Sequence, residues 1–309
     1  MEKIKITIIG LGYVGLPLAL EINKNCRFEV FGYDIDEKVI SNIKEFPVNS
    51  DPRILKNSKI FIICVPTPIK SDFQPDLKPI KSASELVSKY LQKGNSVVIE
   101  STVNPGVCEE VVLPLLEKSG LKGGKDFELS HCPERINPGD PKWDVSNIPR
   151  NIGSLTKEGN KKIADFYRTF LKAEINEVSS LKIAEATKII ENTFRDINIA
   201  YVNELAKSFD MLGIDLIEVI NAASNKPFAF MPHYPGCGVG GHCIPVDPYY
   251  LIERAAVYGF EHSFLKKARE VNNSMPEYTV SLLEKKLINT GKTLKNSKIG
   301  LLGLAYKAD

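Results

Sequence analysis

The sequence predicts an α/β protein that begins with a Rossmann-like dinucleotide-binding domain and continues into a helical domain. Three observations predict it: glycines in GxGxxG spacing directly after a β-branched run, further short apolar runs at intervals, and one long stretch of helical periodicity. At 309 residues the chain is long enough for two domains, each with its own core. We expect an NAD-binding domain at 1–179, a helical central domain at 180–294, and the first strand of a further domain at 295–309.

The first strand and helix lie in "KIKITIIGLGYVGLPLAL". Its glycines permit a tight turn and let a pyrophosphate approach the start of the following helix. The second strand, "FEVFGYD", ends at Asp34, about 20 residues further on, where an acid binds the adenine ribose and disfavours the extra phosphate of NADP. We therefore predict NAD as the cofactor. The predicted contacts of these first elements are Gly10, Gly12, Tyr13, Val14, Gly15 and Asp34.

Three more strands follow in "SKIFIICVPTP", "NSVVIESTVNPG" and "FELSHCPERINPGD". Polar residues stand where these strands end: Thr67, Thr102 and Glu134. In an open parallel sheet the carboxyl ends of the strands line the ligand crevice. We therefore expect these three side chains at the same sheet edge as the glycine loop, with Thr67 and Thr102 beside the cofactor.

A long helix is predicted from about Ser180 to Leu212, because this stretch contains neither proline nor glycine and Gly213 offers a stop. At 1.5 Å per residue it would approach ~50 Å, which suits a helix that joins two domains or forms a dimer interface. Lys188 and Asn192 are four residues apart and share a face. Apolar residues recur at three- and four-residue steps: Ile183, Ala186, Ile190, Phe194, Ile197, Tyr201, Leu205 and Phe209.

The segment "PGCGVGGHCIPVDPYYL", residues 235–251, contains four glycines and two cysteines. Backbone with so few side chains is used where something approaches closely, so Cys243 is expected to be more exposed than a core cysteine. A zinc or redox site formed by Cys237, His242 and Cys243 is the alternative. Adjacent His242 and Cys243 are awkward as joint ligands, and no second Cys/His pair completes a tetrahedral set. We predict no metal.

Composition excludes several classes of protein. The formal net charge is +2 with 25% charged residues, and no dense basic stripe points to nucleic acid. No apolar stretch approaches the ~20 residues that span a bilayer, and the N-terminus lacks the layout of a signal peptide. The six cysteines are scattered without a CxxC pair, so free thiols are expected. These features predict a cytoplasmic protein without nucleic-acid or membrane partners.

The motifs "GLGYVGLP", "VPTP", "ESTVNPG", "CPERINPG", "ATKIIENTFRDINIAYVNELA" and "PGCGVGGHCIPVDPYYL" occur in this order. The chain thereby resembles the UDP-glucose/GDP-mannose dehydrogenase family from end to end. Members of that family oxidise the C6 alcohol of a nucleotide sugar to a carboxylate with two NAD. The resemblance implies Cys243 as the nucleophile and Thr102 as a residue on the nicotinamide side. It further implies catalytic roles for Lys188, Asn192 and Asp247, and for Glu134 as general base.

The sequences of several motifs, among them "PERINPGD" and "KPFAFMPHYPG", resemble those of the family branch that oxidises UDP-N-acetylhexosamines, especially UDP-N-acetylglucosamine. One alternative is a dehydrogenase that oxidises UDP-glucose or UDP-N-acetylmannosamine. Another is a single-step dehydrogenase of the β-hydroxyacid type, a family that shares the Lys188/Asn192 pair. A homodimer through the long helix is expected. The predicted substrate contacts are Glu134, Arg135, Lys188, Asn192, Arg195, Tyr234 and Gly240.

The family has a second Rossmann-like domain at its C-terminal end. Here "NSKIGLLGLAYKAD" resembles the first strand of that domain, and Lys307 resembles one of its ligand-contacting lysines. A lone strand cannot bury both of its faces. The resemblance therefore implies that this chain is truncated relative to the family.

Overall fold

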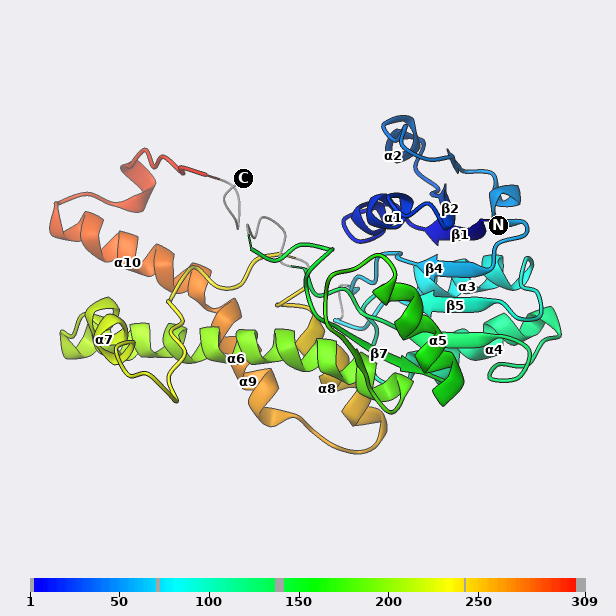
Figure 1. Cartoon of the computed structure of the whole chain (residues 1–309). Helices are drawn as coiled ribbons and strands as arrows, with labels where there is room; N and C mark the ends of the chain where they lie inside the picture. Colours follow the sequence, from blue (N-terminus) through cyan, green and yellow to red (C-terminus); the bar gives the residue numbers. More distant parts are fainter. Residues whose placement is uncertain (1–2, 71–72, 137–141, 242, 304–309) are drawn as a thin grey trace. The chain divides into compact units, whose positions relative to one another are not determined.

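The computed structural model describes residues 3–70, 73–136, 142–241 and 243–303 (Figure 1). The chain divides into two compact units, residues 1–189 and 190–309, and the division falls within one long helix. Lys307 and His242 lie outside the described residues.

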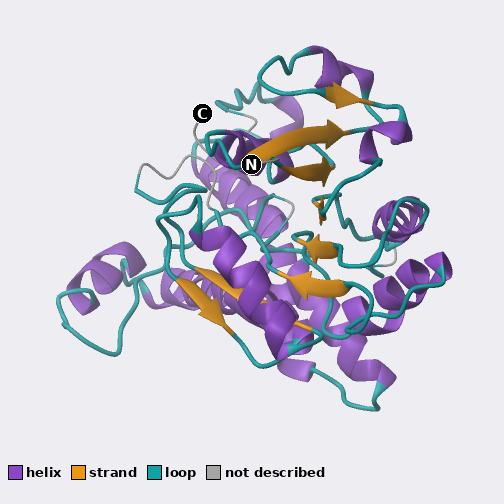
Figure 2. Cartoon of the chain, turned by 45° about the vertical axis from the view of Figure 1, so that its right-hand side comes forward, coloured by secondary structure: helices purple, strands orange, loops and turns teal. Residues whose placement is uncertain are grey.

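Unit 1 is built on one eight-stranded sheet with the strand order β3-β2-β1-β4-β5-β6-β7-β8. Strands β1 to β6 pair in parallel, β7 is antiparallel to β6, and β8 is parallel to β7. The strands, drawn in orange in Figure 2, are β1 (Ile4–Ile9), β2 (Phe28–Tyr33), β3 (Val48–Asn49), β4 (Ile60–Ile63), β5 (Ser96–Ile99), β6 (Glu128–His131), β7 (Arg150–Ser154) and β8 (Ile175–Glu177). The order 3-2-1-4-5-6 is that of dinucleotide-binding domains, so the predicted Rossmann-like fold is confirmed.

Helices cover both faces of this sheet, which is why its central strands are apolar on both sides. All four residues of β4 and of β5 are buried. One core cluster packs α1 (Gly15–Asn23) and α5 (Lys157–Arg168) on the sheet, and a second packs α3 (Lys78–Ser88) and α4 (Leu113–Leu116). Shorter elements complete the unit: α2 (Glu37–Ser41), η1 (Pro52–Leu55), η2 (Cys108–Val112) and η3 (Glu117–Ser119).

The predicted long helix is confirmed as α6 (Leu181–Leu212). It ends at Leu212, and the following Gly213 has a φ of 69°, in the left-handed region that favours glycine. The Ile214 N–H donates back to the Phe209 carbonyl at 3.0 Å. The other helices of unit 2 are α7 (Leu216–Ala223), α8 (Asp247–Val257), α9 (Ser263–Asn273), α10 (Met275–Asn289) and η4 (Leu294–Asn296).

The apolar stripe of α6 is buried only at its end, where Leu205 and Phe209 pack against the cluster of Val202, Leu216 and Ile220. Ile190, Phe194 and Tyr201 are 59%, 47% and 57% exposed. The row that is buried contains Ile189, Asn192, Asp196, Ala200 and Asn203 at three- and four-residue steps, and Val202 packs separately with Leu216 and Ile220 of α7. Periodicity identified the helix correctly, but it could not show that a row rich in polar residues is the more deeply buried one.

The sequence predicts a strand after residue 294. Residues 297–303, the part of that segment the structure describes, form no strand, and the Leu302 side chain is 99% exposed. A strand is stabilised by pairing with a neighbour, and no described strand pairs with this segment. Among the described helices, none combines the length and the apolar character needed to cross a membrane.

Candidate active site

The glycine loop between β1 and α1 has the geometry of a dinucleotide site. Gly10 has a φ of 90°, and a Cβ at Gly10 would lie 2.7 Å from the Cys64 carbonyl oxygen. A Cβ at Gly15 would lie 1.9 Å from the Gly10 carbonyl oxygen, so both positions exclude a side chain. At Gly12, by contrast, a Cβ would meet no described atom within 4 Å. The loop is therefore tight on the protein side and open on the side where a pyrophosphate would bind.

Asp34 lies directly against this loop at the end of β2. Its Oδ2 accepts the Leu11 N–H at 2.7 Å, and its Oδ1 accepts the Asp36 N–H at 2.9 Å. Val14, the N-cap residue of α1, makes no side-chain hydrogen bond to the helix, so the first N–H groups of α1 are not satisfied by a capping side chain. Tyr13, which lies between Gly12 of the loop and Val14, is exposed. The residues present thus fit NAD, with an anion-binding helix start and a half-buried acid for the ribose.

Hydrogen bonds join the segments that follow β4 and β5. The Thr67 hydroxyl donates to the Thr102 carbonyl at 2.7 Å, and the Ser101 hydroxyl donates to the Val65 carbonyl at 2.8 Å. The Glu134 N–H donates to the Glu100 carbonyl at 3.5 Å one strand further along. Strands β4, β5 and β6 therefore bring Thr67, Thr102 and Glu134 to the same carboxyl edge of the sheet, as the strand spacing predicts.

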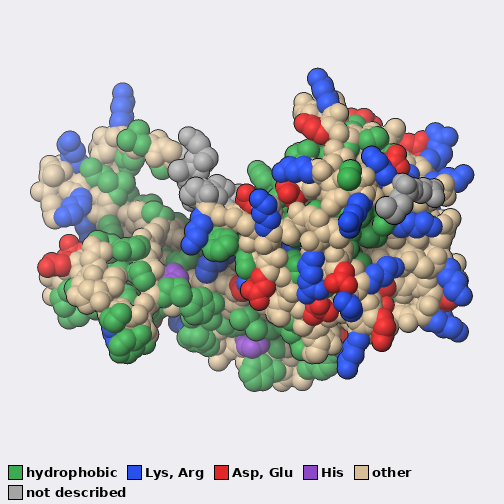
Figure 3. All heavy atoms as spheres, viewed as in Figure 1, with side chains coloured by type: hydrophobic (Ala, Val, Ile, Leu, Met, Phe, Trp, Pro, Cys, Tyr) green, Lys and Arg blue, Asp and Glu red, His purple; other side chains and the backbone are tan. Residues whose placement is uncertain are grey.

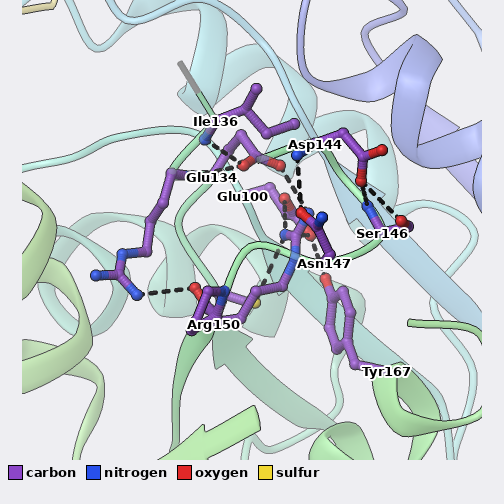
Figure 4. A network of polar contacts seen from close by, with 11 residues as sticks. Glu100, Glu134, Ile136, Asp144, Ser146, Asn147, Arg150 and Tyr167 are labelled. Atoms are coloured by element: carbon purple, nitrogen blue, oxygen red, sulfur yellow. Dashed lines mark hydrogen bonds and ion pairs between the residues drawn. The ribbon is translucent and has the colours of Figure 1, made fainter. Parts of the chain in front are cut away.

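Glu134 is held by three hydrogen bonds (Figure 4). The N–H groups of Arg135 and Ile136 donate to its Oε1 at 2.5 and 2.7 Å, and Nη2 of Arg150 donates to its Oε2 at 2.7 Å. The side chain is only 9% exposed. A carboxylate with this many donors is a fixed negative charge in a defined orientation.

Arg150 is fully buried and also contacts Glu100, whose oxygens lie 3.0 and 2.9 Å from its Nη1. The Tyr167 hydroxyl, from α5, donates to the same Glu100 carboxylate. Burial raises the pKa of Glu100 to about 7, against the opposing effect of Arg150. Burial also raises the pKa of Tyr167 well above its ordinary value, so this hydroxyl remains a donor.

The sequence did not indicate this network. One signal was available: Arg150 opens a strand whose five residues are all buried, which is an unusual place for an arginine unless it is paired.

In unit 2, Cys243 is exposed, as predicted, and lies one turn before α8. Its carbonyl accepts the N–H groups of Val246 and Asp247 at 3.0 and 2.9 Å. Asp247, the first residue of α8, is buried, and its Oδ2 accepts the Asn192 amide of α6 at 2.6 Å. Arg195 in turn donates to the Asn192 Oδ1. The start of the α8 helix is therefore fixed to α6 in the segment next to the cysteine.

The other end of the glycine-rich loop is also attached to α6. The Gly236 N–H donates to Asn203 Oδ1 at 2.9 Å, and Asn203 donates to Asn272 of α9 at 2.9 Å. Asn272 and Arg269 both bind the buried Asp196 carboxylate, at 2.8 and 2.5 Å. The sequence did not predict this chain of polar contacts, which holds the loop that carries Cys243.

The remaining predicted residues are spread over both units. Lys188 is half-buried on α6, and the described residues include no hydrogen-bond or ion-pair partner for it. Arg135 donates to the Pro149 carbonyl at 2.8 Å, the Tyr234 hydroxyl donates to Asn221 at 3.0 Å, and Gly240 is exposed. Their roles stay predictions.

All six cysteines are unpaired, as expected, and Cys64 is a core residue. His242 of the alternative zinc site lies outside the described part of the chain. Within that described part, no group of three or more His, Cys, Asp or Glu side chains is placed to hold a metal ion.

Two family models match the sequence. The NAD-binding domain of the UDP-glucose/GDP-mannose dehydrogenase family matches residues 4–50 and 45–171, and the central domain of the same family matches residues 182–274. The chain belongs to the UDP-glucose/GDP-mannose dehydrogenase family. It is therefore an NAD-dependent oxidoreductase that acts on UDP-sugars, and the predicted enzyme class and cofactor are confirmed.

Known relatives agree with this membership. A UDP-N-acetyl-D-glucosamine 6-dehydrogenase of Pseudomonas aeruginosa is 41% identical, across 99% of this chain and 76% of its own length. A UDP-N-acetyl-D-mannosamine dehydrogenase of Pyrococcus horikoshii is 35% identical, across 98% of this chain and 76% of its own length. The solved structure of a UDP-D-ManNAc dehydrogenase from Pyrococcus horikoshii matches 94% of this chain and 73% of its own, with a TM-score of 0.87.

Proposed function

We propose that this protein oxidises the C6 hydroxyl of a UDP-N-acetylhexosamine, UDP-N-acetylglucosamine first among them, to a carboxylate with two NAD. The observation that carries the proposal is the exposed Cys243 at the start of α8, beside the buried Asn192–Asp247 pair. The 41% identity to the N-acetylglucosamine enzyme, against 35% to the N-acetylmannosamine enzyme, supports the choice of sugar.

The proposed chemistry requires a nucleophile that retains the intermediate. Loss of one hydride and one proton from the alcohol gives an aldehyde, and the Cys243 thiolate adds to its carbon to form a thiohemiacetal. Loss of a second hydride and proton gives a thioester, which water hydrolyses to the carboxylate and the free thiol. NAD, when bound, accepts the two hydrides, one per molecule.

Several side chains have proposed roles in these steps. Lys188 and the second N–H of the Asn192 amide stabilise the oxyanion on the carbon attached to sulfur. Asp247 holds Asn192 and takes part in proton transfer. Glu134 orients the attacking water, because its carboxylate is held in place by three donors. Thr102 lines the nicotinamide side of the cofactor site.

Recognition of the substrate is proposed to use the polar groups near these residues. Arg135 and Arg195 serve the diphosphate or the acetamido group, since guanidinium groups bind both charged and polar oxygens through several N–H donors. Tyr234 and Gly240 complete the predicted contacts.

The same proposal includes the domain boundaries at 179/180 and 294/295 and a location in the cytoplasm.

We also propose a homodimer that covers the exposed stripe of α6. Three large apolar side chains of one helix, Ile190, Phe194 and Tyr201, are about half exposed in the single chain. Figure 3 shows many apolar side chains over α6 and α7 on the face drawn. Contiguous apolar surface of this kind is typical of a protein–protein interface.

The yield of NADH tests the reaction. The proposal predicts two NADH per UDP-N-acetylglucosamine consumed by the purified protein, whereas a single-step dehydrogenase of the β-hydroxyacid type gives one. Parallel assays with UDP-glucose, UDP-N-acetylmannosamine and UDP-N-acetylgalactosamine test the choice of sugar. Cys243→Ser is expected to lower uronate formation by orders of magnitude while NAD still binds, since a serine hydroxyl carries almost no anion at neutral pH. A fully active Cys243→Ser protein would contradict the mechanism.

A further inference from the structure

The cluster of Glu100, Arg150, Glu134 and Tyr167 contains more buried charge than packing requires (Figure 4). Arg150 and Glu100 are completely buried, and Glu134 nearly so. Removing an arginine and two carboxylates from water is costly, and apolar residues of similar volume would fill such a space at no such cost. Packing alone therefore does not explain this cluster.

The geometry of the cluster suggests that role. The guanidinium is a rigid planar fork, and its two ends contact different partners: Nη1 contacts Glu100, and Nη2 contacts Glu134. Because the fork is rigid, the position of Glu100 determines the position of the Glu134 oxygen that Nη2 binds. Tyr167 of α5 fixes Glu100 from the far side.

We propose that Arg150 is a positioning residue for Glu134, and that Glu100 and Tyr167 hold Arg150 in place. A carboxylate has about four acceptor positions, and three on Glu134 are occupied by Arg135 N–H, Ile136 N–H and Arg150. The remaining position is aimed in one direction, as the orientation of a single water or hydroxyl group requires. This inference rests on the proposed function, in which Glu134 orients the water that hydrolyses the thioester.

The charge of the cluster adds a second property. The titratable groups that face Glu100 are Arg150, Glu134, Tyr167, Cys132 and Cys64. Burial raises the pKa of Cys132 to about 12, and it raises the pKa values of Cys64 and Tyr167 well above their ordinary values. Among the members whose pKa values are shifted, Glu100, with a pKa of about 7, is the one that changes charge near neutrality. Through the shared guanidinium, that change alters the environment of the Glu134 carboxylate.

A double-mutant cycle tests the positioning role. Arg150→Lys keeps the positive charge but loses the fork, and misplacement of a reacting group by about 1 Å costs on the order of 100-fold in rate. We expect kcat for UDP-N-acetylglucosamine to fall by about that factor while the KM for NAD is unchanged. In a Glu134→Gln background the same substitution should have no further effect on kcat. Arg168→Lys, in α5 with exposed ion pairs to Asp165 and Glu177, is the matched control and should change neither value.

A merely structural role gives a different result. It predicts that Arg150→Lys lowers kcat by the same factor in both backgrounds and also changes the KM for NAD. Either outcome, additive losses in the cycle or an unchanged kcat in Arg150→Lys, overturns the proposal.

A second measurement does not need turnover. In protein labelled with ¹³C at the glutamate carboxyl groups, and assigned with Glu100→Gln and Glu134→Gln, the Glu134 signal should shift with a midpoint near the Glu100 pKa of about 7. Glu100→Gln should abolish this shift, because glutamine does not titrate. A Glu134 signal that does not change over that pH range contradicts the inference. If the protein forms no NADH with any UDP-sugar, the proposed function fails, and this titration still decides whether Arg150 couples the two carboxylates.

Discussion

The Asn192 amide donates a 2.6 Å hydrogen bond to the Asp247 carboxylate, and both side chains are buried. This contact joins the middle of α6 to the first residue of α8, immediately after the segment that carries Cys243. The amide proposed to stabilise the oxyanion therefore also holds the segment that carries Cys243 against α6. Its two N–H groups allow both tasks, since only one of them is needed for Asp247.

Removal of this pair is expected to destabilise the protein. Asn192→Ala leaves the buried Asp247 without its amide donor, and a lost hydrogen bond to a buried charged group costs about 1.5–3 kcal/mol. Urea unfolding should show that decrease in the free energy of unfolding. Asn198→Ala on the same helix is the control, because among the described residues the Asn198 amide donates to the Phe194 carbonyl at the surface and not to a buried charge. Equal stability of the two variants would argue against a structural role for the pair.

Cofactor preference should follow from Asp34. Its carboxylate is fixed beside Leu11 of the glycine loop, where it can accept hydrogen bonds from a ribose and repel a 2′-phosphate. We expect calorimetry to give tighter binding of NAD than of NADP, and Asp34→Ser to reduce the difference by weakening NAD. Equal affinities for the two cofactors in the wild-type protein would refute this prediction.

Cys243 should be the fastest of the six cysteines to react with iodoacetamide. It is exposed and is the nucleophile of the proposed mechanism, which requires a thiolate, whereas Cys64, Cys108 and Cys132 are buried with raised pKa values. The exposed Cys26 and Cys237 are the internal controls for access alone. Mass spectrometry after brief labelling measures all six, and bound UDP-sugar should protect Cys243. Labelling of Cys243 at the rate of Cys26 would show that exposure, and not activation, sets its reactivity.

The homodimer should depend on the stripe of α6. Light scattering is expected to give twice the chain mass of 34.4 kDa, and Ile190→Glu together with Tyr201→Glu should give the monomer with unchanged helix content by circular dichroism. A charged group in the centre of an apolar interface is left without water or a partner. Ile35→Glu, at an 83% exposed position of unit 1, should leave the mass unchanged. A monomeric wild-type protein at micromolar concentration would contradict the dimer.

Stability should depend on pH through Glu100. Its pKa rises from 4.5 to about 7 on folding, so between these values the native state holds a proton that the unfolded chain has released. The free energy of unfolding therefore falls as the pH increases through this range, by ~3 kcal/mol at about 1.4 kcal/mol per pKa unit. The contribution of Glu100 to the free energy of unfolding is complete below pH 4.5 and is lost above pH 7. Unfolding of the wild-type protein and of Glu100→Gln, compared across pH 4–8, isolates the contribution of Glu100. If the two free energies of unfolding depend on pH in the same way, the raised pKa of Glu100 is contradicted.

Local patterns in the sequence determined much of this protein. The GxGxxG spacing after a β-branched run, Asp34 at the end of the second strand, and the polar residues after the next strands predicted the dinucleotide fold and the edge where Thr67, Thr102 and Glu134 meet. The stretch without glycine or proline before Gly213 predicted α6 to within one residue. These features are predictable because each depends on backbone preferences and periodicity over a few neighbouring residues.

Only the tertiary structure decided which side chains become partners. Glu100 and Arg150 are 50 residues apart, and Asn192 and Asp247 are 55 apart, so no local pattern relates them. The antiparallel pairing of β7 with β6 brings Arg150 to the carboxyl edge of a mostly parallel sheet, where it meets two carboxylates. Likewise, the sequence showed an apolar stripe on α6, but only its end, Leu205 and Phe209, packs against α7, and Ile190, Phe194 and Tyr201 remain exposed. Burial and pairing depend on the sum of many distant contacts, which a short stretch of sequence does not encode.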